Sequence, residues 1–126
     1  MSSKGTAKKT IVMKVGGKYE ETGFLRNKST GETLDIETYL FKAGTKGDID
    51  DADQFKAFTV TVFQNADDNN NWWYKRTMSA ADVLAHATAG IFSGVWDQWY
   101  SDDSGTTWIK HIRGSLIIEK KATDLS

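Results

Sequence analysis

The sequence contains no cysteine and no proline among its 126 residues. Without cysteine the chain cannot form disulfides, cysteine-ligated zinc sites or iron–sulfur clusters, and it has no thiol for catalysis. Without proline, its turns depend on the 11 glycines and on Asn, Asp and Ser. The fold must therefore be held together by a core of ordinary side chains.

Long apolar runs and a charge excess are also missing. No stretch approaches the roughly 20 apolar residues of a membrane-spanning helix, and residues 1–5 lack the apolar centre of a secretory signal. We therefore expect no membrane span, and a protein that is cytoplasmic or released without a signal peptide. The formal net charge of −1 argues against a general binder of polyanions, so nucleic acid is only a secondary expectation.

Aromatic residues are what the sequence has in excess. They make up 12% of the chain, and each large ring buries roughly 150–250 Å², so a few rings can form a small core. The length fits one domain. We predict a flexible basic N-terminal tail over 1–9, a single β domain over 10–120 and a C-terminal tail over 121–126.

Most of the chain has the pattern of short β-strands separated by turn signals. The strongest segment, Phe55–Phe63, is rich in β-branched and aromatic residues and is predicted to be a central strand. Alternation over Leu34–Phe41 predicts another strand, with its even-numbered residues on one face. Val95–Tyr100 and Thr107–Arg113 predict a hairpin, and Gly114 predicts a β-bulge after it.

One helix is predicted, over about 80–89. Ser79 is a good N-cap, Asp82 stands three residues later as in a capping box, and Gly90 suits the left-handed residue that ends a helix. The whole pattern predicts a mainly β fold, an antiparallel β-sandwich or barrel of about seven or eight short strands, with this short α-helix inserted before the C-terminal hairpin.

No catalytic motif is present. Of the 2 histidines, His86 is expected on the exposed side of the helix beside Asp82, and His111 is expected to pack in a sheet. No nucleophile elbow, phosphate-binding glycine loop or paired-histidine metal motif accompanies them. We therefore expect a protein that acts by binding and is not an enzyme.

One loop is rich in carboxylates. Asp48, Asp50 and Asp53 lie close together in the sequence, and calcium prefers oxygen ligands. The segment is not an EF-hand, because Ala52 occupies a ligand position and Thr59 stands where the bidentate Glu belongs. No cofactor is predicted. The aspartates are weak candidates for calcium, against the alternative that they simply form turns.

Two groups of aromatic residues stand beside polar loops. One directly follows the Asn/Asp run 65–71, and the other precedes the acidic loop 101–105. Rings stack on the C–H face of a sugar while carboxylates and amides bind its hydroxyls. In an extended segment Trp72 and Trp73 point to opposite faces, so at most one of the pair is a strong surface candidate. The candidate ligand-binding residues are Trp72, Trp73, Tyr74, Trp96, Trp99, Tyr100, Asp67, Asn69, Asp97 and Asp102.

The leading hypothesis is a lectin-like, non-catalytic protein that recognises a carbohydrate or similar polar ligand through a Trp/Asp/Asn surface. The first alternative is a self-assembling structural or accessory protein of a virus or phage, a homo-oligomer with aromatic residues at subunit contacts. The second alternative is single-stranded nucleic-acid binding, in which the same rings stack on bases beside Lys75 and Arg76. A further reading is that the tryptophans are core residues.

The combination of short strands, acidic loops and clustered tryptophans is similar, in general architecture, to small β-sandwich lectins and to related membrane-binding toxins. This resemblance implies a β-sandwich. It implies no function, because one architecture serves many unrelated activities.

Overall fold

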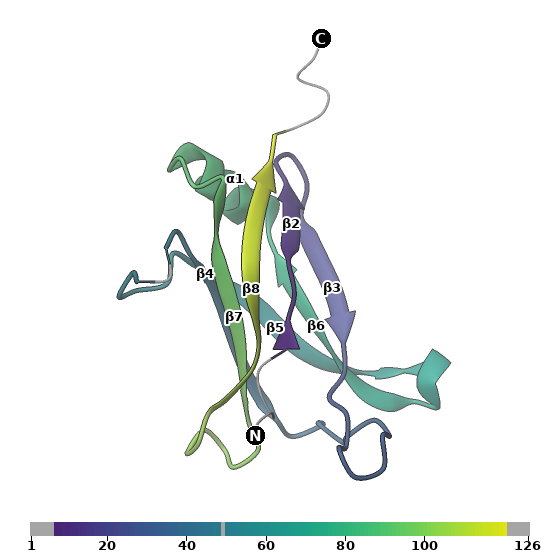
Figure 1. Ribbon diagram of the computed structural model, residues 1–126. Coiled ribbons are helices and arrows are strands. Elements are labelled where there is room, and N and C mark those ends of the chain that lie inside the picture. The colour runs from purple at the N-terminus through teal and green to yellow at the C-terminus, as the bar shows by residue number, and fades with distance from the viewer. Residues whose placement is uncertain (1–6, 49, 121–126) are drawn as a thin grey trace.

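The computed structural model describes residues 7–48 and 50–120 and shows a mainly β protein (Figure 1). Its strands form one curled mixed sheet, a half-barrel, and an α-helix precedes the last two strands. The predicted mainly β class and the predicted helix are therefore confirmed. Of the two predicted tails, residues 1–6 and 121–126 lie outside the described residues, whereas Ala7 and Lys8 form a short strand.

The strands are β1 Ala7–Lys8, β2 Ile11–Lys14, β3 Tyr19–Gly23, β4 Leu40–Lys46, β5 Lys56–Asn65, β6 Asn71–Met78, β7 Ser93–Ser101 and β8 Ile109–Glu119. Helix α1 spans Ala80–Thr88, and a 3₁₀ turn, η1, spans Ala66–Asp68. The strand order is β1-β8-β7-β4-β5-β6-β3, and β2 also pairs with β8. Most pairs are antiparallel, but β1 and β2 run parallel to β8. The predicted hairpin is β7–β8, and β5 is central, as expected.

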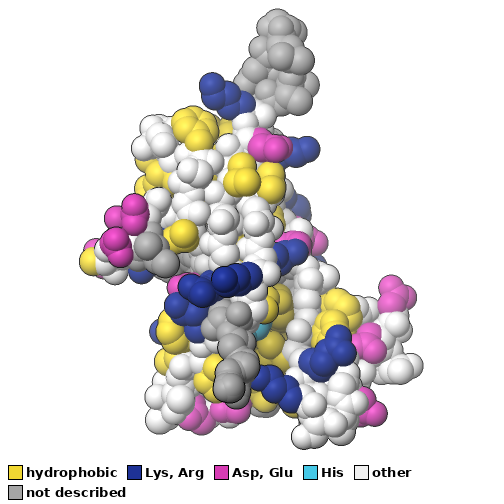
Figure 2. Space-filling view, in the orientation of Figure 1, with side chains coloured by type: hydrophobic (Ala, Val, Ile, Leu, Met, Phe, Trp, Pro, Cys, Tyr) yellow, Lys and Arg dark blue, Asp and Glu magenta, His cyan; other side chains and the backbone are white. Residues whose placement is uncertain are grey.

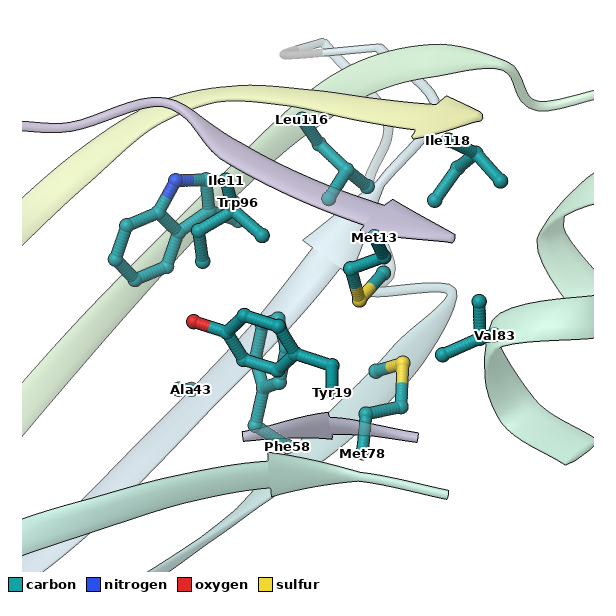
Figure 3. Packing of buried hydrophobic residues seen from close by; sticks show 10 residues of the cluster. All are labelled: Ile11, Met13, Tyr19, Ala43, Phe58, Met78, Val83, Trp96, Leu116 and Ile118. Atoms are coloured by element: carbon teal, nitrogen blue, oxygen red, sulfur yellow. The ribbon is translucent and has the colours of Figure 1, made fainter. Parts of the chain in front are cut away.

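The main core lies where the curled sheet closes around apolar side chains from most of its strands. Figure 3 shows Tyr19, Phe58 and Trp96 facing one another there, with Val83 of α1 at one end. The helix therefore closes one end of the half-barrel. A second cluster is built from Leu25, Ile36 and Tyr74. The buried members of the main cluster are Ile11, Met13, Tyr19, Ala43, Phe58, Met78, Val83, Trp96, Leu116 and Ile118.

Helix α1 begins and ends as its sequence predicts. The Ser79 side chain accepts a hydrogen bond of 3.2 Å from the Asp82 backbone N–H, and Gly90 has a φ of 79°. The expectation for His86 was wrong. Its side chain is 0% exposed, with Nε2 2.7 Å from the Thr45 hydroxyl and Nδ1 2.8 Å from the backbone oxygen of Asp82.

The strand predicted over Leu34–Phe41 is wrong in its first part, because β4 begins only at Leu40. The chain before it turns: the Tyr39 N–H donates to the Ile36 oxygen, and the Asp35 side chain accepts from the Glu37 N–H. A short polar side chain that bonds its own backbone competes with a sheet ladder. Ile36 is fully buried whereas Leu40 is 45% exposed, so the two do not share a face.

The β-bulge predicted at Gly114 is wrong in position, because the irregularity of β8 lies at His111. Gln98 pairs with Ile112 and Trp99 pairs with Lys110, so His111 is the extra residue of β8. Gly114 has another role. A Cβ at this position would lie 1.8 Å from the backbone oxygen of Lys9. The glycine therefore lets the link between β1 and β2 approach β8 closely.

Candidate functional site

Strand β6 separates the adjacent tryptophans as alternation predicts. Tyr74 and Arg76 are 3% and 1% exposed, and Trp72 packs against the second core cluster on the same side. Trp73 points the other way, where its ring lies 4.9 Å from the ring of Phe24 between centroids. Trp73 is therefore the surface candidate of the pair.

The polar run before Trp73 is the turn of the β5–β6 hairpin. The Asn65 side chain accepts a 2.9 Å hydrogen bond from the Asp67 N–H and so caps η1. Asn69 and Asn70 follow with φ of 53° and 61°, a conformation that asparagine tolerates better than most residues. In Figure 1 this turn projects from the body of the half-barrel. Its sequence is thus explained first by turn geometry.

One carboxylate joins this turn to the loop after β3. Asp68 Oδ2 accepts a 2.6 Å hydrogen bond from the Thr33 hydroxyl and a 2.9 Å hydrogen bond from Trp73 Nε1. These bonds hold the pKa of Asp68 below its ordinary value, because they favour the ionised form. The indole is consequently fixed in orientation at its nitrogen, and its ring, which packs on Phe24, remains partly exposed.

The joined segments surround a hollow, which we call the Trp73 site. Its lining includes the indole residue Trp73, the acidic residues Asp68 and Glu32, and the amide residues Asn69 and Asn71. Such groups can bind a ligand that has hydroxyls on one side and C–H groups on the other. The residues that line the Trp73 site are Phe24, Gly31, Glu32, Thr33, Asp68, Asn69, Asn71 and Trp73.

The remaining candidate residues do not join this site. Tyr74 and Trp96, at 3% and 2% exposed, are core residues and cannot stack on a ligand from solvent. Tyr100 stacks on Tyr39, with ring centroids 5.5 Å apart, beside the second core cluster. Asp67 and Asp102 are exposed turn residues, and Trp72 is occupied by core packing. Asp97 and Trp99 lie on a different surface, on the outer side of β7.

Polar side chains cross the interior between these two surfaces. Arg76 donates to the Tyr19 hydroxyl at 3.0 Å, to Gln98 Oε1 at 2.8 Å and to Glu21 Oε1 at 3.2 Å. Gln98 Nε2 lies 2.9 Å from His111 Nε2. Because the Gln98 oxygen faces the guanidinium, its amide hydrogens face the imidazole, so Nε2 of His111 is unprotonated.

Burial explains the electrostatics of this interior network. Desolvation, aided by the charge of Arg76, lowers the pKa of His111 to about 4. Partial burial opposes ionisation of Glu21, but hydrogen bonds from Tyr19 and Lys9 bring the pKa of that carboxyl below its ordinary value. Arg76 is thus part of the core, and its side chain is not accessible to a ligand from solvent.

The acidic loop uses its carboxylates on its own backbone. Asp48 Oδ1 accepts from the Asp50 N–H, and Asp51 Oδ2 accepts from the Asp48 N–H, each at 3.0 Å. Over residues 7–48 and 50–120, no three His, Asp or Glu side chains lie close enough together to hold a metal ion. The side chains of Asp48 and Asp51 therefore stabilise the turns of this loop.

Sequence reasoning found Trp73 and Asn69 but missed most of the Trp73 site. Phe24, Glu32 and Thr33 come from a segment about forty residues away in sequence, and no local pattern marks them. The sequence predicts Asp67 as the polar partner, whereas Asp68 is the carboxylate that lines the site. The distinction arises only because η1 turns one carboxylate toward Thr33 and Trp73.

Comparison of the chain with protein-family models, with curated proteins and with solved structures finds no match. Within the part of the chain that the structure describes, no helix is long and apolar enough to cross a membrane.

Proposed function

We propose that the protein binds a carbohydrate, or a similar polyhydroxylated ligand, at the Trp73 site. The observation that carries the proposal is the Trp73 indole beside the Asp68 carboxylate and the amides of Asn69 and Asn71 in one hollow. A sugar would place a C–H face on the ring and share its hydroxyls between carboxylate and amide groups.

The electrostatics of the site suit a neutral ligand. Asp68 and Glu32 both line the hollow, and a depressed pKa keeps Asp68 ionised under ordinary conditions. Carboxylates accept hydrogen bonds from hydroxyls but repel anions. A neutral glycan therefore fits better than an acidic one.

A pair of neighbouring asparagines provides a matched test. Both Asn69 and Asn70 have positive φ, which glycine adopts readily, but only Asn69 lines the hollow. Asn69→Gly should keep the turn and weaken glycan binding by roughly five- to tenfold, the effect of one lost hydrogen bond. Asn70→Gly should leave binding unchanged.

The experiment is a glycan-array screen followed by calorimetric titration of the best glycan into both variants. Trp73→Ala should abolish binding, with circular dichroism to confirm that the fold persists. The proposal is wrong if no glycan binds the intact protein, or if Asn69→Gly and Asn70→Gly weaken binding equally.

A second candidate function, self-assembly, is favoured by exposed apolar side chains on another surface. Val12 and Ile117 are 44% and 39% exposed and pair across β2 and β8, and Phe92, 41% exposed, is near them. A second copy of the chain could cover these residues. Size-exclusion chromatography with light scattering tests the idea, and a stable monomer at high concentration would eliminate it.

A further inference from the structure

The outer side of β4, β7 and β8 carries two indoles among basic side chains. We call this surface the Trp99 face and define it by Lys42, Lys46, Trp99, Trp108, Lys110 and Arg113. Lys42 of β4 and Lys110 of β8 are the direct cross-strand neighbours of Trp99. Neighbours in adjacent strands point to the same side of a sheet, so the three side chains form one row.

Distances show how the row is arranged. Lys110 Nζ lies 5.1 Å and Lys42 Nζ 5.8 Å from the centre of the Trp99 ring. Lys42 Nζ is also 4.4 Å from the centre of the Trp108 ring. One ammonium thus lies close to both indoles, and a second lies close to Trp99. Both rings are only partly buried.

More positive charge lies next to this row. Adjoining shallow hollows along β7 are bordered by Lys46, Arg113 and Lys8 as well as by Lys42 and Lys110. Among the described residues, Lys46, Arg113 and Lys8 form no ion pair. Figure 2 shows Lys and Arg side chains in a band over β7 and β8, with hydrophobic side chains beside it.

Carboxylates occur both within the band and beside it. Asp97 lies within it, 3.9 Å from Lys110 Nζ, and Asp53 of the β4–β5 loop borders the neighbouring hollow. The loop carries further aspartates and projects to one side in Figure 2. Although the net charge of the chain is −1, the Trp99 face has more cations than carboxylates: Asp97 is its acidic member and Asp53 lies at its margin.

We propose that the Trp99 face binds single-stranded nucleic acid. Unpaired bases would stack on Trp99 and Trp108, and the ammonium groups of Lys42 and Lys110 would move from the rings to the phosphates. Indoles on a sheet surface can stack only on bases that are not paired, and stacking of this kind tolerates any base. A basic surface with rings between its charges matches a strand of alternating bases and phosphates.

The surface differs in chemistry from the Trp73 site. There, the ring lies beside carboxylates and amides, whereas the ring of Trp99 lies directly beside two ammonium groups. The two proposals therefore concern different residues and different ligands. Either can fail without the other.

The test measures fluorescence anisotropy of labelled twenty-nucleotide oligo(dT) and oligo(U) with the full chain at several salt concentrations. Binding should weaken with salt, since each phosphate contact contributes about −0.7 to the logarithmic slope for single strands. Preference for one oligonucleotide over the other would assign DNA or RNA as the natural source. Absence of binding to both at low salt would overturn the proposal.

Single substitutions distinguish binding at the Trp99 face from binding by positive charge elsewhere on the protein. Lys42→Gln should reduce the salt slope by about 0.7. Lys75→Gln is a matched control, because Lys75 also lies over a ring, that of Phe63 at 5.7 Å, but on β6. Trp99→Ala should weaken binding at least roughly fivefold. If Trp99→Ala fails to fold, the variants Trp99→Phe and Trp108→Phe are used in its place. Oligo(dT) should then quench the tryptophan emission of each variant less than that of the original chain.

Two competition experiments test other occupants. A duplex of the same length that binds as tightly as the single strand would mean that charge alone acts and would overturn base stacking. Polyglutamate that displaces the oligonucleotide at equal charge concentration would indicate an acidic polypeptide and would likewise overturn the proposal. Equal effects of Lys42→Gln and Lys75→Gln would exclude the Trp99 face as the site.

Discussion

Strand β7 carries an indole on each of its faces, and both indoles lie next to cations. On the inner face, Trp96 is 2% exposed and the guanidinium carbon of Arg76 lies 4.5 Å from the ring centre. On the outer face, Trp99 lies beside the ammonium groups of Lys42 and Lys110. An indole beside a cation thus occurs on both faces of one strand, with a guanidinium inside and ammonium groups outside.

The two environments have different consequences. Arg76 donates hydrogen bonds to Glu21, Tyr19 and Gln98. If its guanidinium moved away, these groups would lose a hydrogen-bond partner in the interior. Lys42 and Lys110 lie at the surface, where water can replace the ring at little cost. We infer that the inner cation maintains the fold, whereas the exposed Lys42 can exchange its ring contacts for a ligand.

The largest expected effect comes from removing the inner cation. Arg76→Met keeps the apolar stem against Trp96 but leaves Gln98 and the Tyr19–Glu21 pair without the guanidinium. Breaking a buried charged network in this way costs roughly 3 kcal/mol of unfolding free energy. Urea denaturation measures the loss. A loss below about 1 kcal/mol would mean that the interior tolerates the change and that the two faces differ less than we infer.

The second largest effect should come from acid, which lowers the unfolding free energy by protonating His111 of the inner network. The folded-state pKa of His111, about 4, lies below its ordinary value of 6.5. The unfolded chain therefore binds more protons between these values, so stability is full above about pH 6.5 and falls as the pH drops toward 4. The shift corresponds to about 3 kcal/mol.

Urea denaturation across this pH range measures the decline. Burial also lowers the pKa of His86, so the His111→Gln variant is needed to isolate one histidine. That variant should show a distinctly shallower decline than the original chain. An identical decline in both would show that His111 is not the group responsible.

A methyl group added at Gly114, next to the inner indole, should lower the unfolding free energy by less than the two changes above. The Trp96 Nε1 group donates to the Lys9 backbone oxygen at 2.9 Å, and a Cβ on Gly114 would lie 1.8 Å from that oxygen. Gly114→Ala should therefore lower the unfolding free energy by about 1–3 kcal/mol. Gly17→Ala is the control, since its added Cβ would meet nothing within 4 Å. Thermal unfolding of both variants gives the comparison, and equal melting temperatures would contradict it.

The smallest expected effect on stability comes from the outer cation. Lys42→Gln removes a contact with two rings, but at an exposed position such contacts contribute less than about 1 kcal/mol. Urea denaturation should therefore distinguish this variant clearly from Arg76→Met. If both variants lost equal stability, the outer cation would also be structural, and the contrast between the faces of β7 would not hold.

Local patterns predicted much of the fold correctly. The N-cap at Ser79 and the glycine at position 90 delimit the helix as expected, because capping depends on residues adjacent in sequence. Alternation correctly placed Trp96 and Gln98 opposite Asp97 and Trp99. A period of two is a property of extended chains and requires no knowledge of neighbours.

Features that depend on distant segments were not predictable. The parallel pairing of β1 and β2 with β8 joins opposite ends of the chain. The bulge lies at His111, whose imidazole contacts Gln98, and Gln98 in turn accepts from Arg76 of another strand. The carboxylate of the Trp73 site belongs to Asp68, since Thr33 lies opposite it and not opposite Asp67.

The sequence by itself determined that the chain is mainly β, contains a capped helix, and places Trp72 and Trp73 on opposite faces. These properties follow from backbone sterics and from bonds between near neighbours. Only the tertiary structure decided which tryptophans are buried and which cations lie beside them. Alternation says that two faces exist, but the curling of the sheet determines which face encloses the core and which remains open to a ligand.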